Sequence, residues 1–342
     1  MTLNNPLIPP LTVEVTRGAM VESRHRGDCV VIDRTGKVVR GWGGIDRLIY
    51  PRSAIKPLQA LPLIETGAAD AFDISEAELA LAAASHSSTP DHVNAIAAWL
   101  ERLGLSESDL ECGGHDPMHR DSDKALIRSG VVPGPLYNNC SGKHAGFLNT
   151  ARHMGEETKG YLGPDHPVQQ RLAAVMEEMG ATDLSETPRG VDGCGIPVYG
   201  MALRAMALAM ARMADPQDLE PARADAAKRI YKAMTSHPNM VGGPGRFDTV
   251  AMTAGKGAFV VKAGAEGVYA GIVPGLGLGV ALKIDDGTKR AAEVAMAGVL
   301  DLLGVLDIEA KAGMQDFLTA PVLNSAGLRV GDIRMADGWA EG

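Results

Sequence analysis

The sharpest chemical feature of the sequence is Ser53, which is followed three residues later by Lys56. A strand-like run and a proline precede Ser53, and Pro57 leads into an apolar stretch, so we expect Ser53 near a helix N-terminus with Lys56 on the same face. A serine hydroxyl becomes a strong nucleophile when a base takes its proton, and a lysine can do this if its neighbours lower its pKa from about 10.4 toward 7 to 8. The alternative is a helix N-cap with a solvated lysine in the first turn.

A second serine and a second lysine are candidates for the same chemistry. Ser85 comes at the end of a small-residue stretch that predicts a helix, where it would otherwise act as a C-terminal cap. Lys262 lies on a predicted strand just before Gly264, which mirrors the Lys-x-Gly element of serine penicillin-recognising enzymes. An exposed strand lysine is the alternative for Lys262, and Lys256 is the second choice for its role.

Two cysteines in glycine-rich turns form the next candidate site. Cys140 and Cys194 occupy positions where partly exposed thiolates are common, and with one or two nitrogen or oxygen donors they would make a zinc site with an open position. The alternative is a pair of buried or incidental thiols, because no Cys-x-x-Cys pair is present. Cys112, His115 and His119 form a rival cluster, but the tight loop between them would not hold the two histidines on one helix face.

Composition excludes several classes of protein. The chain has 342 residues, a net charge of −9 and 45% hydrophobic residues, so it can bury a large core and has no basic stripe for nucleic acid. No apolar run approaches the roughly 20 residues that span a bilayer, and residues 1–10 are not a secretory signal. Four cysteines are too few for a disulfide framework. We therefore expect a cytoplasmic protein with no nucleic-acid or membrane partner.

The pattern of elements indicates an α/β fold. It predicts strands at both ends of the chain and helices in the middle, so we expect a mostly antiparallel sheet built from both chain ends with a helical region inserted between them. Predicted strands cover 11–16, 29–33, 37–42, 258–263, 268–273 and 278–284, with a hairpin turn at 264–267. One predicted helix begins at a Ser75–Glu78 capping box and another at Thr89-Pro90. Further predicted helices cover 122–129, 144–154, 168–179, 201–213, 222–234 and 290–303. We expect one catalytic domain over 1–342, with sheet parts at about 11–60 and 245–340 and a helical part at about 75–235.

Seven short motifs, taken together and in order, resemble the Rhizobium etli-type L-asparaginase family. The resemblance runs from about Val13 to the C-terminal region, and each motif is modest alone while their order is specific. The motifs are Arg17-Gly18, residues 51–57, Ala84-Ser85-His86-Ser87, Cys112-Gly113-Gly114-His115, residues 139–144, Asp192-Gly193-Cys194-Gly195 and the turn at 264–267.

The resemblance implies a fold similar to serine β-lactamases and glutaminases, and two Ser-Lys pairs. These pairs map onto Ser53 with Lys56 and onto Ser85 with Lys262. The Ser-x-x-Lys arrangement is also that of penicillin-binding proteins and β-lactamases. The resemblance further implies a zinc ion held by two cysteines and an unusual lysine, which carry over to Cys140, Cys194 and Lys143. Because a lysine must be neutral to bind zinc, such a site would depend on pH.

The function that follows is hydrolysis of L-asparagine to L-aspartate and ammonia. Ser53, deprotonated through the lysines, would attack the side-chain amide, and backbone N–H groups near Ser53 would stabilise the oxyanion. We expect zinc to assist by holding the α-amino and α-carboxylate groups of the substrate. Arg52, His144 and Asp192 are the candidate residues for the same recognition.

Several alternatives stay open at the level of sequence. L-Glutamine differs from L-asparagine by one methylene, which is worth only about 1 to 3 kcal/mol in a pocket. A β-lactamase-like or peptidase-like hydrolase lacks support because the Ser-Asp-Asn motif is absent, and asparaginases with an N-terminal Thr-Gly-Gly-Thr segment or an autoprocessing threonine fit worse. A non-catalytic zinc-dependent module that binds an amino acid is the alternative outside enzymes. The oligomeric state is expected to be a homodimer only because dimers are common.

Overall fold

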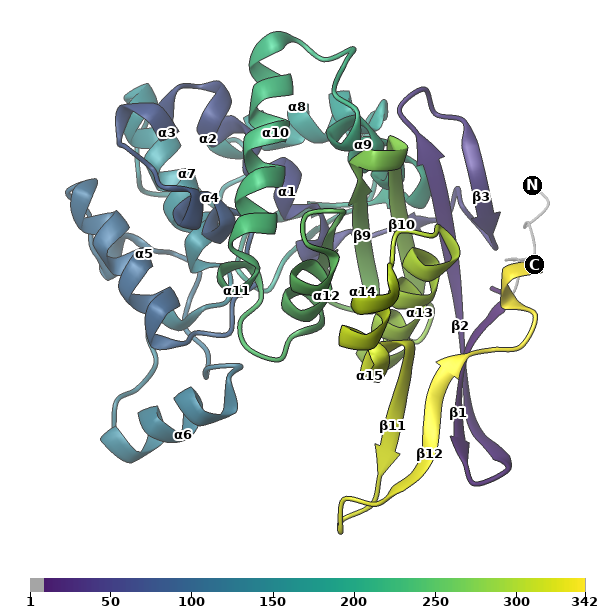
Figure 1. Cartoon of the computed structure of the whole chain (residues 1–342). Helices are drawn as coiled ribbons and strands as arrows, with labels where there is room; N and C mark the ends of the chain where they lie inside the picture. The colour runs from purple at the N-terminus through teal and green to yellow at the C-terminus, as the bar shows by residue number, and fades with distance from the viewer. Residues whose placement is uncertain (1–8, 342) are drawn as a thin grey trace.

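The computed structural model describes residues 9–341, and its main feature is an antiparallel sheet whose strands come from both ends of the chain (Figure 1). Within that range the sheet has eight strands, and each hydrogen-bonded pair in it is antiparallel. The order is β11 (Thr319–Leu323), β12 (Arg329–Met335), β1 (Leu11–Arg17), β2 (Met20–Asp33), β10 (Leu278–Ile284), β9 (Val268–Val273) and β8 (Val260–Ala263), with β3 (Val38–Trp42) also paired to β2. The predicted mostly antiparallel sheet with a helical insertion is confirmed.

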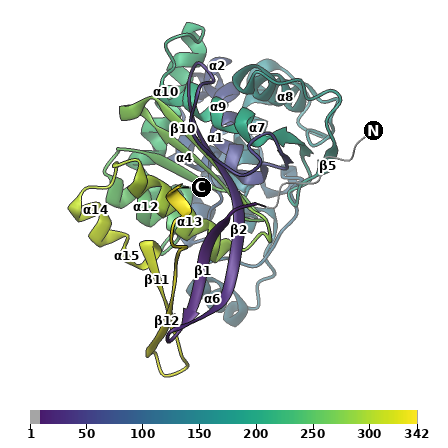
Figure 2. The same ribbon diagram turned by 90° about the vertical axis from the view of Figure 1, so that its right-hand side faces the viewer.

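The long strand β2 joins the two halves of this sheet, and Figure 2 shows it running past β1. Its first half pairs with β1, and its second half, from Gly27, pairs with β10. A Cβ at Gly27 would lie 2.8 Å from the carbonyl oxygen of Lys283, so this crossing point requires glycine. The sequence predicted only the second half of β2, because the first half is largely exposed and charged and carries no apolar signal.

Helices cover both faces of the sheet. α9 (Leu203–Ala214) lies so close to β10 that a Cβ at Gly279 would be 2.1 Å from the carbonyl oxygen of Ala207. On the opposite face, Gly271 of β9 lies beside Met296 of α13 (Lys289–Leu302). The helix predicted at 290–303 matches α13 within one residue. The helix predicted from residue 201 starts two residues later, because residues 201–202 form the short strand β7 with β4 (Leu48–Ile49).

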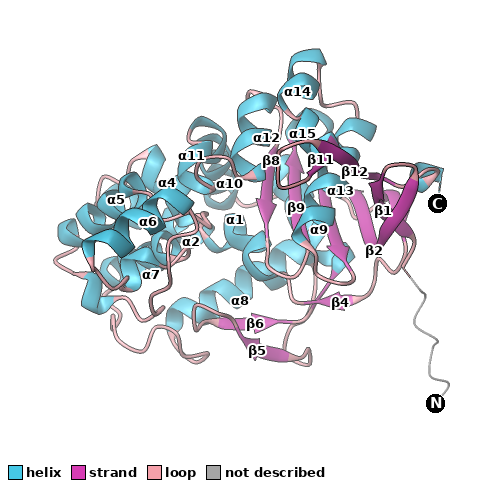
Figure 3. Ribbon diagram, turned by 90° about the horizontal axis from the view of Figure 1, so that it is seen from below, coloured by secondary structure: helices cyan, strands magenta, loops and turns pink. Residues whose placement is uncertain are grey.

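The helical part lies to one side of the sheet (Figure 3). The helix predicted at 144–154 begins three residues earlier, at Ser141, and its Gly142 packs so close to α4 (Glu76–Ala82) that a Cβ would lie 2.5 Å from the carbonyl oxygen of Leu81. The helices and 3-10 turns of this helical part are η1 (Arg52–Ile55), α1 (Lys56–Gln59), α2 (Leu61–Glu65), α3 (Ala68–Ala71), α4 (Glu76–Ala82), α5 (Pro90–Arg102), η2 (Glu107–Asp109), α6 (Arg120–Ser129), η3 (Pro135–Tyr137), α7 (Ser141–Met154), α8 (Pro167–Gly180), α10 (Pro221–Ser236), α11 (Pro238–Val241) and α12 (Phe247–Gly255).

The remaining elements are a small hairpin and short helices outside the main sheet. β5 (Arg189–Val191) and β6 (Pro197–Tyr199) form a separate hairpin, and η4 (Pro274–Leu276) joins β9 to β10. α14 (Ile308–Gly313) and α15 (Gln315–Leu318) lie between α13 and β11 in the chain, and η5 (Trp339–Glu341) follows β12. No helix in residues 9–341 is long and apolar enough to cross a membrane.

The two helix starts predicted from capping residues are confirmed. Ser75 accepts a hydrogen bond from the backbone N–H of Glu78 at 3.3 Å, and the Glu78 carboxylate accepts one from the backbone N–H of Ser75 at 2.9 Å. Thr89 is the N-cap of α5, with Pro90 at its first position. Local sequence is sufficient for these starts because the capping partners lie within one turn.

Candidate active site

Ser53 lies in the tight turn η1 between β4 and α1, and it lines a cavity of about 370 Å³. The preceding residue, Arg52, has a φ of +51°, a left-handed conformation that costs a non-glycine residue about 1 to 3 kcal/mol. The Arg52 guanidinium is held by Asp192, whose Oδ1 accepts hydrogen bonds from Nε at 3.0 Å and Nη2 at 2.8 Å. This pair ties the strained turn to the β5–β6 hairpin and presents Ser53 to the cavity.

Lys56 is fully buried one turn after Ser53, and its amine points to the second serine. Its Nζ donates to Ser85 Oγ at 3.1 Å, to Cys140 Sγ at 3.1 Å and to the carbonyl oxygen of Ala84. The Ser53 hydroxyl forms no hydrogen bond to any residue within 9–341. In this structure Lys56 is therefore joined to Ser85 rather than directly to Ser53.

Lys262 reaches the same serine from β8. Its Nζ donates to Ser85 Oγ at 2.9 Å and to the carbonyl oxygen of Ala263 at 2.8 Å, and it lies 3.7 Å from Oδ2 of the buried Asp248. Lys256, the second choice, is at the surface and pairs with Glu309. The structure thus brings Lys262, and not Lys256, to Ser85.

Burial changes the acid–base properties of both amines at Ser85. Burial is the main cause that lowers the pKa of Lys262 to about 7; the Asp248 carboxylate opposes this shift, and the Lys56 charge adds to it. Burial also lowers the pKa of Lys56, with the Cys140 sulfur acting in the opposite direction. A lysine with a pKa near neutrality can accept and return a proton at physiological pH.

Close packing aligns the β8–β9 turn with the Ser53 turn. A Cβ at Gly264 would lie 2.8 Å from the carbonyl oxygen of Pro51 and 3.1 Å from the backbone nitrogen of Ala54, so only glycine fits there. Glu266 and Gly267 have φ values of +59° and +69°, which close the hairpin predicted at 264–267. The turn that follows Lys262 therefore forms one wall of the cavity.

The predicted metal ligands Cys140, Lys143 and Cys194 lie together and are buried beside the cavity. Lys143 Nζ lies 3.2 Å from Cys194 Sγ. A hydrogen bond from Cys194, together with the charges of Lys56 and Lys143, lowers the pKa of Cys140 well below its usual range. Burial lowers the pKa of Lys143, but the Cys194 and Cys140 sulfurs outweigh burial and raise it.

These three side chains fit a zinc ion by their donor chemistry. Thiolate sulfur and neutral nitrogen are the ligands that zinc prefers, and a three-ligand set leaves a position open. Among residues 9–341 no group of three or more His, Cys, Asp or Glu side chains is placed to hold a metal. A zinc site here therefore requires the Lys143 amine as the third protein ligand.

The rival cluster of Cys112, His115 and His119 does not converge on one point. Cys112 Sγ contacts the carbonyl oxygen of Pro135 at 3.7 Å, and His115 Nε2 accepts from the backbone N–H of Asn139 at 2.9 Å. His119 caps α6 through its Nδ1. Each side chain has a separate structural partner, as expected from the loop between them.

His144 does not line the large cavity, although it was a candidate for substrate recognition. Its ring is fully buried, and its Nδ1 hydrogen-bonds to Tyr161 Oη at 2.8 Å. Burial and the Lys143 charge lower the pKa of His144 well below its usual range. Of the three recognition candidates, the structure brings Arg52 and Asp192 to the cavity.

Three charged residues of the cavity wall were missed by sequence reasoning, namely Arg246, Glu266 and Lys289. Arg246 follows a Gly-Pro-Gly segment before α12, and that loop is the one sequence signal that marks it. Glu266 was noted only as part of a turn. These residues are distant in sequence from Ser53, so only the folded chain shows that they share its cavity.

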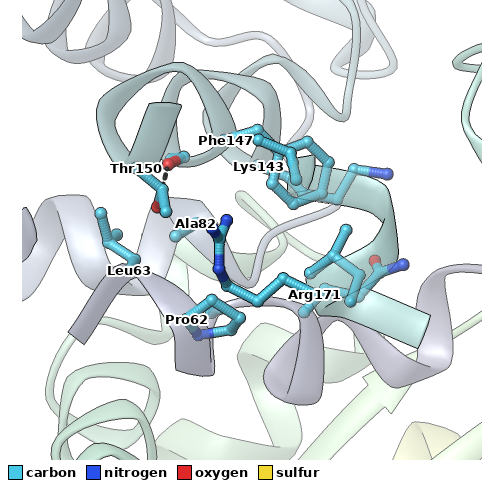
Figure 4. Close-up of a pocket in the computed structure, with 12 residues that line it drawn as sticks. Pro62, Leu63, Ala82, Lys143, Phe147, Thr150 and Arg171 are labelled. Carbon is cyan, nitrogen blue, oxygen red and sulfur yellow. Dashed lines mark hydrogen bonds between the residues drawn. The ribbon is translucent and has the colours of Figure 1, made fainter. Parts of the chain in front are cut away.

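A second, much smaller cavity, of about 10 Å³, is lined in part by Lys143 (Figure 4). Lys143 and Phe147 of α7 and Arg171 of α8 border it, and the Lys143 amine lies 5.5 Å from the Phe147 ring centre. A space of this size holds at most a water molecule, so an amino acid cannot bind there. The cavity beside Ser53 is the candidate substrate site.

Structural comparison finds solved structures with a limited likeness to this chain. A putative beta-lactamase from Bacteroides dorei is similar at 15% identity with a TM-score of 0.43, over 80% of this chain and 92% of that chain. A beta-lactamase from Sphaerobacter thermophilus is similar at 12% identity with a TM-score of 0.41, over 83% and 93% of the two chains. TM-scores below 0.5 give these likenesses no weight for function.

Sequence comparison gives the family. A search of the curated proteins finds no match. The model of the family described as L-asparaginase II matches residues 13–335, which is nearly the whole chain and includes each predicted site residue. The chain therefore belongs to the L-asparaginase II family and is an amidohydrolase.

Proposed function

We propose that the protein hydrolyses L-asparagine to L-aspartate and ammonia through an acyl-enzyme on Ser53. The observation that carries the proposal is the buried hydrogen-bonded chain of Lys56, Ser85 and Lys262 next to the cavity that Ser53 lines. Two amines on one serine, both with lowered pKa, are suited to moving protons rather than to holding a fold together.

In the first half of the reaction, Ser53 Oγ attacks the side-chain amide carbon of the substrate. Its proton passes to the lysine amines, directly or through Ser85 Oγ, and the backbone N–H of Ser53 at the start of η1 is suited to stabilise the oxyanion. The carbon–nitrogen bond breaks as the lysines return a proton to the leaving nitrogen, which departs as ammonia. The Ser53 hydroxyl has no competing partner within residues 9–341, and catalytic hydrogen bonds often form only in the substrate complex.

In the second half, water attacks the acyl carbon of the enzyme ester. The same amines accept a proton from the water and deliver one to Ser53 Oγ as the ester bond breaks, so L-aspartate leaves and the serine is restored. Lys262, with a pKa of about 7, is the amine best suited to exchange a proton in both halves.

Assistance by zinc is a further part of the proposal, supported by the clustering of its predicted ligands. Cys140, Lys143 and Cys194 would hold the ion, and when bound it would supply a Lewis acid for the amino and carboxylate groups of the substrate. Lys143 must lose a proton before it binds a metal, and its raised pKa makes this loss harder at low pH. The Rhizobium etli-type subclass, the cytoplasmic location and the homodimer stay predictions.

Ammonia release from L-asparagine tests the proposal, with L-glutamine in parallel. Ser53→Ala should lower turnover of L-asparagine by roughly 10³-fold or more. Ser325→Ala, at an exposed loop serine, is the matched control and should keep native activity. Activity that survives Ser53→Ala would move the nucleophile to Ser85, a faster rate on glutamine would change the substrate, and no turnover of either amide would favour a binding module.

A further inference from the structure

The charged residues of the large cavity are not equally free to bind a ligand. Arg52 is committed to Asp192 through two hydrogen bonds to one carboxylate oxygen. Lys289 is largely exposed and lies 3.3 Å from the carboxylate of Glu293, one turn further along α13. Both cations therefore already have an acidic partner.

Arg246 differs from these cations. It is half-buried in the cavity wall, its guanidinium lies 3.5 Å from the sulfur of Met118, and no carboxylate in residues 9–341 forms an ion pair with it. Glu266 also lines the cavity, and within the described part of the chain its carboxylate has no ion pair. Among the described residues that line the cavity with Ser53, Arg246 is thus a cation and Glu266 an anion without an ion-pair partner.

The position of Arg246 is fixed by the element that also positions Lys262. Arg246 is the N-cap residue of α12, and two residues later Asp248 accepts a hydrogen bond from the backbone N–H of Ala263 at 3.0 Å. This bond ties the start of α12 to β8 next to Lys262. A binding group on such a braced element keeps a set distance from the reacting groups.

We infer that Arg246 binds the α-carboxylate of the amino-acid substrate and so selects amino acids over simple amides. Guanidinium and carboxylate pair in a planar, charge-assisted geometry, which is stronger than a hydrogen bond between neutral groups. The inference rests on the proposed function for the identity of the substrate. Arg52 was a candidate for substrate recognition, but Asp192 holds its guanidinium. The inference therefore gives recognition of the carboxylate to Arg246.

Calorimetric titration of ligands into the full chain carrying Ser53→Ala tests this without turnover. L-Asparagine is compared with 3-aminopropanamide, which keeps the amine and the amide but lacks the carboxylate. Adding Arg246→Gln should weaken L-asparagine binding roughly 10- to 100-fold and leave 3-aminopropanamide within about twofold. Arg246→Lys should recover part of the loss, and the exposed Arg290→Gln on α13 should change neither ligand.

The outcomes separate this inference from the proposed function. Equal affinity for the two ligands before the Arg246 change, an equal loss for both after it, or no binding of L-asparagine would overturn the inference. A preference for L-asparagine that depends on Arg246, in a chain whose native form releases no ammonia, would support the inference and reject the proposed hydrolysis.

Discussion

Lys262 and Lys143 are both buried beside the same cavity, but they lie in opposite electrostatic surroundings. Around Lys262, burial and the nearby Lys56 charge outweigh Asp248 and bring its pKa to about 7. Around Lys143, the sulfurs of Cys194 and Cys140 outweigh burial and keep the amine charged. The region around Lys262 is therefore suited to proton transfer. Lys143 becomes a neutral amine only when a bound metal ion replaces its proton.

The largest expected effect comes from breaking the proton-transfer region. Lys262→Met or Ser85→Ala should lower kcat for ammonia release by about 10² to 10⁴-fold, because the serine nucleophile loses its route for protons. Lys256→Met is the control, since this surface lysine pairs with Glu309 and lies away from Ser85, and it should stay within about twofold of native activity. A Lys256 variant as impaired as the Lys262 variant would reverse our assignment.

A smaller effect is expected from the metal-binding region. Lys143→Met should reduce bound zinc, measured by elemental analysis, and should raise KM by roughly 10- to 100-fold, as for loss of a metal-site partner. The effect on kcat should be much smaller than for Lys262→Met. A loss of kcat with unchanged KM in Lys143→Met would show that this region acts in turnover and not, as we propose, in substrate binding.

The smallest change is expected in the pH profile and involves Asp248. Catalysis needs Lys262 neutral, so kcat/KM should rise with pH through a pKa of about 7. The Asp248 carboxylate favours the charged amine, so Asp248→Asn should lower that pKa and move the acid limb to lower pH by about one unit. Asn keeps an oxygen for the backbone N–H of Ala263, and a lower rate with an unmoved limb would indicate a purely structural role for Asp248.

The sheet and the helix starts were predictable because their signals are local. Short runs of mostly apolar residues marked β8, β9 and β10, and the capping box of Ser75 and Glu78 marked the start of α4. Half of β2 and the hairpin of β11 and β12 were missed, because their largely exposed or half-buried residues leave no clear alternation. The first half of β2 and β12 both pair with β1, and β11 pairs with β12. Such pairing partners are not encoded within a strand.

The candidate site was predictable where its residues lie within short motifs. Ser53 and Lys56 lie within one turn, so their spacing suggested their chemistry, and Cys140 was indicated by its glycine-rich turn. Lys143 was indicated only by the family resemblance. Arg246 was not predicted, because a single arginine in a loop has no sequence feature that points to a ligand.

By itself, the sequence determined that this chain forms an α/β fold with strands at both ends, and that a Ser-x-x-Lys segment lies at a helix start. Only the tertiary structure decided that Ser85 receives Lys56 from α1 and Lys262 from β8, 177 residues away along the chain. It also decided that His144 is buried away from the cavity and that Arg246 faces it. The physical reason is that hydrogen-bond partners and pKa values depend on which distant groups share a buried volume, and packing between elements sets that arrangement.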